Sequence, residues 1–392
     1  MNRAVHTLTA LATGISLTSV AAAQTLTWEP QTPPDSPGIR AAMGLAHDPV
    51  RGKTVLFGGT AAAFYGDTWE WDGSAWTQLA PATSPPAKWG LSMAYDSARN
   101  QTLVFGGFSN TVAQWQQTWS FDGTNWTLMA TTGPTGRYYC AMAFDSARNK
   151  MVLFGGIRSN RFNQTWEWDG TAWTQIATPT SPSARYTPAM AYDSARHVCV
   201  MFGGNVGSGA LAYNDETWEY DGTTWTQRLV TGPIGRYNHN MVYDSDRGVC
   251  VLYGGVNGAS DNYLSDTWEW DGTTWTEQAI TSAGARAQQG MAYDSTNHFL
   301  LLLGGTSPTG YNNETWELHY SGPTGPVCDT IDFNGDGLYP DTADIDDFLS
   351  VFSGGSCSTG TCGDLDYNND TLFPDTADID SLLSVFSGGA CL

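Results

Sequence analysis

Apolar and polar positions along the chain repeat with a period of about 50 residues. Six short apolar runs each end in a Gly-Gly pair, and the steps between successive pairs are 48, 49, 48, 51 and 50 residues. An Asp stands ten residues before the first Gly of every pair, and a basic residue stands eighteen residues before it. Repetition at this period predicts an array of similar units that bury their apolar faces against one another. The pairs end at Gly59, Gly107, Gly156, Gly204, Gly255 and Gly305.

Each unit contains four predicted strands. In the first unit they lie at 43–48, 54–59, 67–71 and 75–79, where apolar and polar residues alternate or form short apolar runs. An Asp-Gly pair separates strands three and four, and it predicts a tight hairpin because Gly adopts positive φ without a Cβ clash. Four-stranded units of this length are typical of the blades of a β-propeller.

One hairpin sequence, TWEWDGTTW at 267–275, recurs with small changes in four other units. A catalytic group would not be needed in so many copies. One large aromatic residue per blade, in contrast, fills the wedge between neighbouring blades and buries apolar area. We therefore interpret the stretch as scaffold. The related copies stand at 68–76, 118–126, 165–173 and 217–225.

The two ends of the repeat region predict how the ring closes. A Trp of strand four stands 29 or 30 residues before the first Gly of the next unit, and Trp28 stands 30 residues before Gly58. The last unit stops after its third strand. Residues 25–30 should therefore supply the missing strand beside residues 314–319. This closure gives six blades and leaves no exposed sheet edge.

The repeat pattern resembles the kelch β-propeller family over about residues 25–320. The resemblance is carried by the six Gly-Gly pairs, by the strand-four Trp and by an aromatic residue of strand three. The Asp-Gly hairpin is shorter than the usual kelch loop. The resemblance implies an all-β fold and a partner bound on one face of the ring. The strand-three aromatics are Trp71, Phe121, Trp168, Tyr220 and Trp270.

The repeats differ from one another at one end only. The turns between strands one and two and between strands three and four barely vary, whereas the two–three loops and the four–one connections vary in length and content. Strand alternation places the variable segments together, on what we call the loop face, and the constant turns on the opposite turn face. Binding residues of a repeat protein are expected where the copies diverge.

Candidate ligand-binding residues on the loop face are the basic column and nearby aromatic residues. Aromatic side chains among polar loops suit a sugar ring or a protein partner. In the alternative interpretation the basic residues brace the fold by pairing with a backbone carbonyl or with the repeated acid, and Tyr138, Tyr186 and Tyr237 merely pack beside them. The candidates are Arg40, Lys88, Trp89, Trp115, Arg137, Tyr138, Arg185, Tyr186, Arg236, Tyr237, Tyr263, Arg286 and Tyr311.

Catalytic and metal motifs do not stand out in the propeller region. No pair of His residues has the spacing of HExxH, and no nucleophile elbow or phosphate loop is evident. Cys140 and His239 share one variable column, so a copper site formed with a Tyr stays an alternative. Cys199 and Cys250 share a strand-two column and are interpreted as small buried hydrophobic residues.

The N-terminal segment indicates an exported protein, and the net charge restricts its partners. The net charge of −22 argues against a nucleic-acid partner, which would require a basic surface. Residues 1–23 read as a secretion signal, with Arg3, a weakly apolar run and a small-residue site at 21–23. No other apolar run approaches the roughly 20 residues of a spanning helix. We expect a secreted or cell-surface protein whose propeller occupies 24–320, followed by a linker at 321–327.

The C-terminal region, 328–392, contains 13 Asp and neither Lys nor Arg. Two similar segments, 328–357 and 362–391, each open with alternating oxygen-bearing residues as in a calcium loop, and apolar residues at helical spacing follow. Bound calcium would relieve the repulsion between these carboxylates. The alternative is a solvated acidic tail held by disulfides. Three pairings are open to its cysteines, Cys328, Cys357, Cys362 and Cys391.

This tail resembles a dockerin-type domain, which is built from two EF-hand-like loop–helix units. The resemblance implies calcium as a cofactor and a surface or cohesin-like partner that tethers the protein. The closing acid of each loop stands one place later than in the family. The candidate calcium ligands are Asp332, Asn334, Asp336, Leu338, Asp341, Asp344, Asp366, Asn368, Asp370, Leu372, Asp375 and Asp378.

Together these patterns predict an exported, non-catalytic binding or adhesion protein. Its loop face would bind a glycan or a protein, and its tail would provide calcium-dependent tethering. The main alternative is an enzyme that acts on sugars on the same scaffold, such as an epimerase or mutarotase or, less expected, a copper oxidase. A purely architectural surface protein is the third hypothesis.

Overall fold

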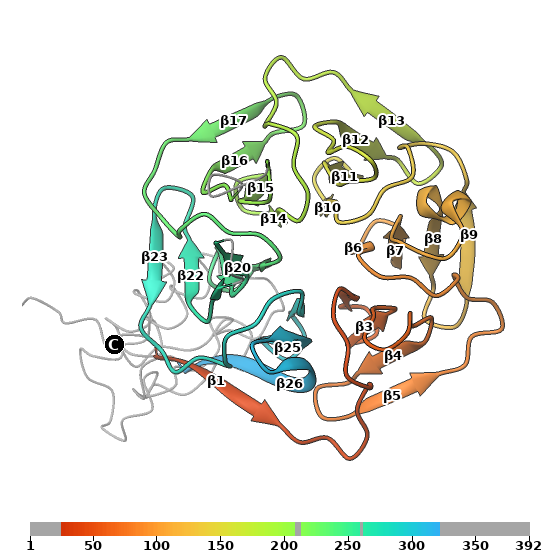
Figure 1. The fold of residues 1–392 in the computed structure, drawn as a ribbon, viewed down its shortest axis with the longest axis vertical. Coiled ribbons are helices and arrows are strands. Elements are labelled where there is room, and N and C mark those ends of the chain that lie inside the picture. Colours follow the sequence, from red (N-terminus) through yellow and green to blue (C-terminus); the bar gives the residue numbers. More distant parts are fainter. Residues whose placement is uncertain (1–24, 208–212, 259–261, 322–392) are drawn as a thin grey trace, which may run out of the picture. The chain divides into compact units, whose positions relative to one another are not determined.

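The computed structural model describes residues 25–207, 213–258 and 262–321. Residues Leu26–Tyr320 form one compact unit. Six four-stranded sheets surround a central axis, as Figure 1 shows. The all-β class and the six-bladed propeller are therefore confirmed. The predicted signal peptide, the predicted calcium tail and nearly all of the predicted linker lie outside the described residues.

The blades are numbered in chain order, and the strands of each blade are given from the innermost to the outermost. Blade 1 contains β2 (Gly44–Asp48), β3 (Lys53–Phe57), β4 (Thr68–Trp71) and β5 (Trp76–Leu79). Blade 2 contains β6 (Ser92–Asp96), β7 (Gln101–Phe105), β8 (Thr118–Phe121) and β9 (Trp126–Ala130). Blade 3 contains β10 (Ala141–Asp145), β11 (Lys150–Phe154), β12 (Thr165–Trp168) and β13 (Trp173–Ile176).

Blades 4 to 6 follow the same order. Blade 4 contains β14 (Ala189–Asp193), β15 (Val198–Phe202), β16 (Thr217–Tyr220) and β17 (Trp225–Arg228). Blade 5 contains β18 (Asn240–Asp244), β19 (Val249–Tyr253), β22 (Thr267–Trp270) and β23 (Trp275–Gln278). Blade 6 contains β24 (Gly290–Asp294), β25 (Phe299–Ser307), β26 (Gly310–Ser321) and β1 (Thr25–Gln31). Loop elements are η1 (Val112–Gln116), β20 (Val256–Asn257) and β21 (Asn262–Tyr263).

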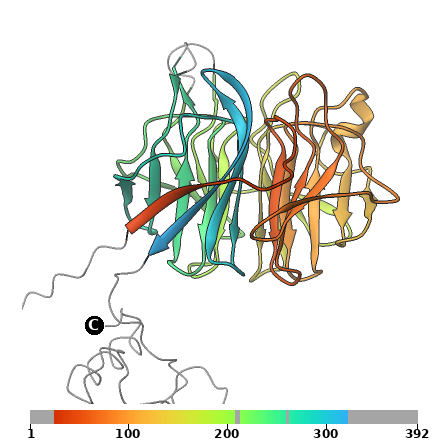
Figure 2. The same ribbon diagram turned by 90° about the horizontal axis from the view of Figure 1, so that it is seen from below.

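The ring closes as predicted, because β1 is the outer neighbour of β26 in the sheet order β1-β26-β25-β24. Figure 2 shows these first and last described strands running together along one side of the propeller. Trp28 of β1 is buried, and its indole Nε1 donates a hydrogen bond to Thr267 Oγ1 of blade 5 at 3.2 Å. The N-terminal strand thus connects blade 6 to its neighbour.

Every blade makes this same contact with the blade before it. The strand-four Trp donates from its indole nitrogen to the Thr that opens strand three of the preceding blade. The repeated TWEW…W sequence therefore contains both partners of a contact that runs around the whole ring. The six Trp–Thr pairs are Trp76–Thr315, Trp126–Thr68, Trp173–Thr118, Trp225–Thr165, Trp275–Thr217 and Trp28–Thr267, at 2.7 to 3.2 Å.

The Gly-Gly pairs form a second ring of contacts between blades. The second Gly donates its backbone N–H to the carbonyl of the basic residue of the next blade, for example Gly59 to Lys88 at 2.9 Å and Gly305 to Arg40 at 2.9 Å. Both glycines have positive φ. A Cβ on the first Gly would lie only 2.5 to 2.8 Å from that same carbonyl oxygen in each of the six blades. Close backbone approach therefore requires glycine here.

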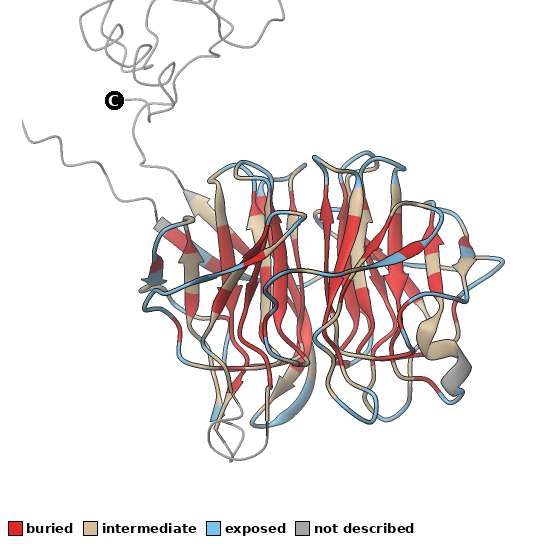
Figure 3. Ribbon diagram, turned by 90° about the horizontal axis from the view of Figure 1, so that it is seen from above, coloured by how far each residue is buried: buried red, intermediate tan, exposed pale blue. Residues whose placement is uncertain are grey.

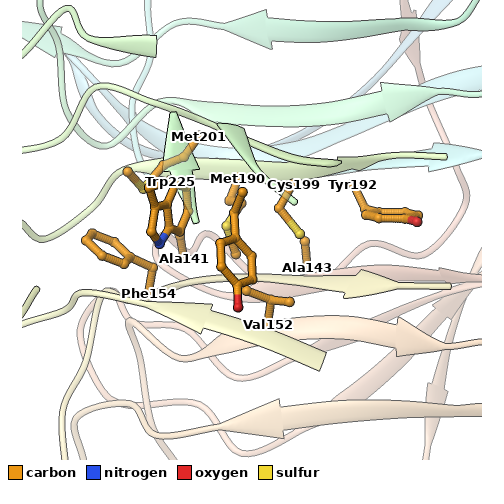
Figure 4. Close-up of a cluster of buried hydrophobic side chains, with 10 residues drawn as sticks. Ala141, Ala143, Val152, Phe154, Met190, Tyr192, Cys199, Met201 and Trp225 are labelled. Carbon is orange, nitrogen blue, oxygen red and sulfur yellow. The ribbon is translucent and has the colours of Figure 1, made fainter. Parts of the chain in front are cut away.

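Apolar packing between neighbouring blades forms the core, and each cluster draws on two sheets. Figure 4 shows one cluster, in which Phe154 of blade 3 lies beside Trp225 of blade 4 and Ala143 of blade 3 lies beside Cys199 of blade 4. Figure 3 shows that buried residues fill the strands and exposed residues lie at both ends. Cys199 and Cys250 are buried and free, which confirms their interpretation as core residues. Within the described residues, no helix has the length and apolar character needed to cross a membrane.

The turn face is held together by charged pairs. The repeated Asp at the end of strand one accepts hydrogen bonds from the backbone of the following turn, and in blades 1 to 5 it pairs with an Arg three residues later. In blade 6 the corresponding residue is Asn297, which donates from Nδ2 to Asp294 at 3.0 Å. In blade 3, Asp145 pairs with Arg148 at 2.7 Å, and Arg148 also contacts Glu167 at 2.7 Å. Because these side chains are engaged with one another, the repeated acid is used for local structure.

Candidate functional site

The predicted basic column lies inside the propeller. Each of its Arg residues donates from Nη1 to the carbonyl of the first Gly of its own blade, at 3.0 to 3.4 Å, as for Arg185 and Gly203 at 3.0 Å. These contacts agree with the alternative interpretation, in which the basic residues brace the fold by pairing with a backbone carbonyl. The members of the column, Arg40, Lys88, Arg137, Arg185, Arg236 and Arg286, are at most 2% exposed.

Four of these Arg residues also pair with an acid near the start of strand three, rather than with the repeated Asp of the turn face. Arg236 forms a bidentate pair with Asp266 at 2.6 and 2.7 Å, and Arg40 does the same with Asp67 at 2.8 Å. Burial alone would raise the pKa of Asp266, but the hydrogen bonds and charge of Arg236 outweigh it and lower the pKa. Arg137 instead contacts the neutral Gln164. The positive charges are thus largely neutralised within the wall.

Lys88 is the exception in the column. Its Nζ donates to the Gln114 carbonyl at 3.3 Å, and blade 2 carries Gln117 where blade 1 carries Asp67. Burial lowers the pKa of Lys88 to about 8. Lys88 is removed from water and has no carboxylate partner among the described residues. Its ammonium group therefore loses its proton more easily than the other cations of the column lose theirs.

Seven aromatic side chains form a connected cluster on the loop face of blades 1 to 4, which we call the aromatic cluster. Trp89 lies 5.3 Å from Phe108 and 5.5 Å from Tyr138 between ring centroids, and Trp115 lies 4.6 Å from Phe108. All seven are only partly buried. A contiguous set of partly exposed aromatic side chains marks an interaction surface more often than a single exposed aromatic residue does. The members are Phe64, Trp89, Phe108, Trp115, Tyr138, Tyr139 and Tyr186.

Local backbone structure holds the cluster in place. Trp89, Tyr138 and Tyr186 each follow a basic-column residue and form an isolated bridge with the residue after the Gly-Gly pair of the same blade. Trp115 lies on the short helix η1 and donates from Nε1 to the Ser109 carbonyl at 3.0 Å. Several loops of different blades thus present their rings to one area.

The remaining predicted aromatics lie elsewhere on the loop face. Tyr237 stacks on Tyr213, with centroids 5.1 Å apart and planes inclined by 12°. Tyr263 lies on β21 and pairs with Val256. Tyr311, on β26, is 44% exposed. The structure therefore brings four of the predicted aromatics, Trp89, Trp115, Tyr138 and Tyr186, into one cluster.

A positively charged edge borders the aromatic cluster. Arg161 lies 5.4 Å from the Tyr186 ring centroid and donates from Nη2 to Asn205 Oδ1 at 3.0 Å. Arg158, from the same two–three loop, is exposed. In an acidic chain these two residues give the blade 3 side of the cluster a local positive charge.

Three members of the aromatic cluster, Phe64, Phe108 and Tyr139, were not among the candidate ligand-binding residues of the sequence analysis. Phe108 directly follows a Gly-Gly pair, a position held by Thr, Ile, Asn or Val in the other blades, so its divergence within that column was the available signal. Tyr139 contacts Trp89, Tyr138 and Tyr186 in the aromatic cluster. Its φ of 58° lies in the left-handed region.

The central axis contains a chamber of about 440 Å³ between the innermost strands of the six blades. Tyr139, Cys140 and His239 all line it. Burial raises the pKa of the Cys140 thiol to about 12 and lowers the pKa of His239 to about 3. Among the described residues, no three His, Cys, Asp or Glu side chains are grouped so that they could hold a metal ion.

Comparison with known proteins agrees with this architecture. Residues 50–226 match the family model described as the KLHDC2/KLHL20/DRC7 Kelch-repeats domain. The matched segment runs from the first turn of blade 1 to strand four of blade 4. Comparison with curated proteins gave no match. Residues 50–226 are thus similar to Kelch repeats, and the described residues fold as a six-bladed β-propeller.

Proposed function

We propose that the propeller binds a protein partner on its loop face, through the aromatic cluster. The observation that carries the proposal is the contact network of seven partly exposed rings contributed by four different blades. Trp, Tyr and Arg are the residues most enriched among those that dominate binding energy at protein interfaces. The Kelch-repeat match supports a protein partner over other ligands.

The chemistry of the cluster restricts the partner. Apolar or aromatic side chains of the partner would cover the rings around Trp89 and Trp115, where they lose contact with water. An acidic residue of the partner would lie at the edge formed by Arg158 and Arg161. We therefore expect a segment that combines apolar anchors with at least one carboxylate.

Replacing Trp115 by Ala is expected to weaken partner binding by at least tenfold, because truncation of a central aromatic anchor typically costs about 2 kcal/mol or more. The measurement presents wild type and variant to the same pool of proteins, identifies those retained by wild type, and then compares dissociation constants for each purified candidate. Thr273→Ala, an exposed change on the turn face, is the matched control and should bind as wild type does. Equal loss in both variants, or no loss in Trp115→Ala, would contradict the proposal.

A glycan is the second candidate ligand on this face. The exposed Tyr311 and the stacked Tyr213–Tyr237 pair offer ring faces of the type that pack against sugars. Binding on a glycan array that is lost in Tyr311→Ala but kept in Trp115→Ala would favour this ligand. Turnover on a panel of sugars would favour the enzyme hypothesis instead.

We further propose export and calcium-dependent tethering, on the basis of the sequence patterns in residues 1–23 and 328–392. Removing calcium with a chelator is expected to lower the melting temperature of the C-terminal region, since uncompensated carboxylates repel one another. The propeller's own transition should stay in place. Calorimetry on the full chain with and without calcium measures both transitions, and a tail transition that ignores the chelator would remove calcium from the proposal.

A further inference from the structure

A groove on blade 6 has the size of a ligand site and lies apart from the aromatic cluster. Residues 282–286, from the connection between blades 5 and 6, form one wall, and side chains between 307 and 316, from β25 and β26, form the other. Its volume of about 450 Å³ lies within the range of small-molecule sites. No member of the aromatic cluster lines this blade 6 groove. It is therefore a separate candidate for binding.

The acid at the start of strand three is more exposed in blade 6 than in the other blades that carry one. The Glu314 side chain is 55% exposed, whereas the corresponding side chains of Asp67, Glu216 and Asp266 are 21 to 29% exposed. The wall opposite Glu314 is also smaller, because Ala283 stands three residues before the basic column where every other blade has Pro. Blade 6 thus departs from the repeat at the groove. The prolines are Pro37, Pro85, Pro134, Pro182 and Pro233.

Glu314 is held in place through one of its two carboxylate oxygens. Its Oε2 accepts hydrogen bonds from Arg286 Nη2 at 2.7 Å and from Trp316 Nε1 at 3.0 Å. Among the described residues, both bonds to this carboxylate end on Oε2, so Oε1 stays available to a ligand. Burial alone would raise the pKa of Glu314, but the hydrogen bonds from Trp316 and Arg286, together with the Arg286 charge, lower it. The groove therefore contains an ionised, accessible carboxylate.

The positive charge of Arg286 is directed into the wall. Its side chain is only 3% exposed, and it donates from Nε to the Gly284 carbonyl at 3.3 Å, from Nη1 to the Gly304 carbonyl at 3.4 Å and from Nη2 to the Ala283 carbonyl. Of the described residues that line the groove, Arg286 and Glu314 are the charged ones. The two formal charges cancel, but the cation is buried and the carboxylate is exposed. A ligand in the groove therefore meets negative charge.

We propose that the blade 6 groove binds a primary alkylammonium group, such as the end of a Lys side chain. The ammonium donates to Oε1 of Glu314, and the alkyl stem packs against the partly exposed Trp316, whose ring also attracts cations. An anion is repelled by Glu314, and a neutral ligand leaves this carboxylate without a counter-charge. The net charge of −22 draws cations toward the chain in general. This site goes beyond the proposed loop-face function and does not depend on it.

The test titrates the full chain with Nα-acetyl-lysine amide and follows the indole N–H signals by NMR. The Trp316 signal, identified by its loss in Trp316→Phe, should shift and saturate. Trp268 donates to Asp266 at 2.7 Å in the corresponding place of blade 5, and its signal should stay in position. Nα-acetyl-norleucine amide has a similar stem without the charge and should bind at least tenfold more weakly. Equal affinity for the two amides, or no Trp316 shift up to tens of millimolar, would overturn the proposal.

Variants with matched controls test the carboxylate and the location. Glu314→Gln should weaken binding of the lysine amide at least tenfold, whereas Glu216→Gln, which removes the same kind of ion pair in blade 4, should leave it unchanged. Thr309→Lys places a competing ammonium on an exposed residue of the groove and should weaken binding at least fivefold, whereas Thr273→Lys on the turn face should not. Unchanged affinity in Glu314→Gln or in Thr309→Lys would refute the proposal. Because Trp115→Ala leaves the groove intact, this proposal and loop-face binding can fail separately.

A further comparison distinguishes the two sources of an alkylammonium group, a free amine and a Lys residue of a protein. The probes are n-butylamine and a short peptide in which one Lys is flanked by Gly residues. Equal affinity would identify a free amine as a sufficient ligand. Tighter binding of the peptide would identify a Lys side chain of a protein, and replacing that Lys by norleucine should then abolish the binding.

Discussion

Replacing Trp28 by Ala should lower the free energy of unfolding by about 3 to 5 kcal/mol, the range for truncating a buried aromatic residue. Trp28 is 4% exposed and packs in the cluster shared by blades 5 and 6, with its ring centroid 4.9 Å from that of Tyr253. Its indole also supplies the Trp–Thr pair that closes the ring. The variant therefore loses both apolar burial and the contact through which the N-terminal strand connects two blades. Urea denaturation monitored by fluorescence measures the change.

Trp28→Phe separates the two contributions. Phe keeps most of the apolar area but cannot donate to Thr267, so a smaller loss of about 1 to 2 kcal/mol is expected, which covers one neutral hydrogen bond and a small cavity. Thr267→Val, combined with Trp28→Phe in a double-mutant cycle, isolates the hydrogen bond itself. If Trp28→Ala unfolded at the same urea concentration as wild type, β1 would not contribute to closing the ring.

The architecture could be predicted from the sequence because it depends on spacing along the chain. The six Gly-Gly pairs and the position of Trp28 fix the number of blades and the strand that closes the ring, and both were confirmed. The Thr of the TWEW sequence was not recognised as a partner of the Trp. A hydrogen bond between blades joins residues such as Trp173 and Thr118, which are separated by 55 positions, and a single repeat does not reveal which neighbouring blade it faces.

The binding surface was predictable only in part, for a related reason. Sequence divergence correctly placed Trp89, Trp115, Tyr138 and Tyr186 on one face, because strand alternation determines the end at which a loop lies. It did not reveal that Phe108 and Tyr139 connect these rings, since those contacts depend on how adjacent blades are aligned laterally. The role of the basic column likewise depended on burial, which a repeated Arg does not show by itself.

The contrast between two glycines tests the backbone contacts between blades. Gly155 has a φ of 72°, and a Cβ placed there would lie 2.7 Å from the Arg185 carbonyl oxygen. Gly258 also has positive φ, 89°, but no atom of the described residues lies within 4 Å of its Cβ position. Substitution by Ala imposes a left-handed conformation at both positions, at a cost of about 1 to 2 kcal/mol. Only at Gly155 does it also add a backbone collision.

Gly155→Ala should therefore destabilise the propeller by more than about 3 kcal/mol, the sum of left-handed strain and overpacking, whereas Gly258→Ala should lose only about 1 to 2 kcal/mol. The adjacent hydrogen bond from Gly156 N–H to the Arg185 carbonyl adds to the first effect, because blade 4 must move away from blade 3 to relieve the collision. Denaturant unfolding of both variants gives the difference directly. A Gly155→Ala protein that fails to fold beside a soluble Gly258→Ala protein fits the same account. Equal stabilities would mean that adjacent blades yield at this contact, and the Gly-Gly pairs would then serve only the backbone conformation and not the close approach of blades.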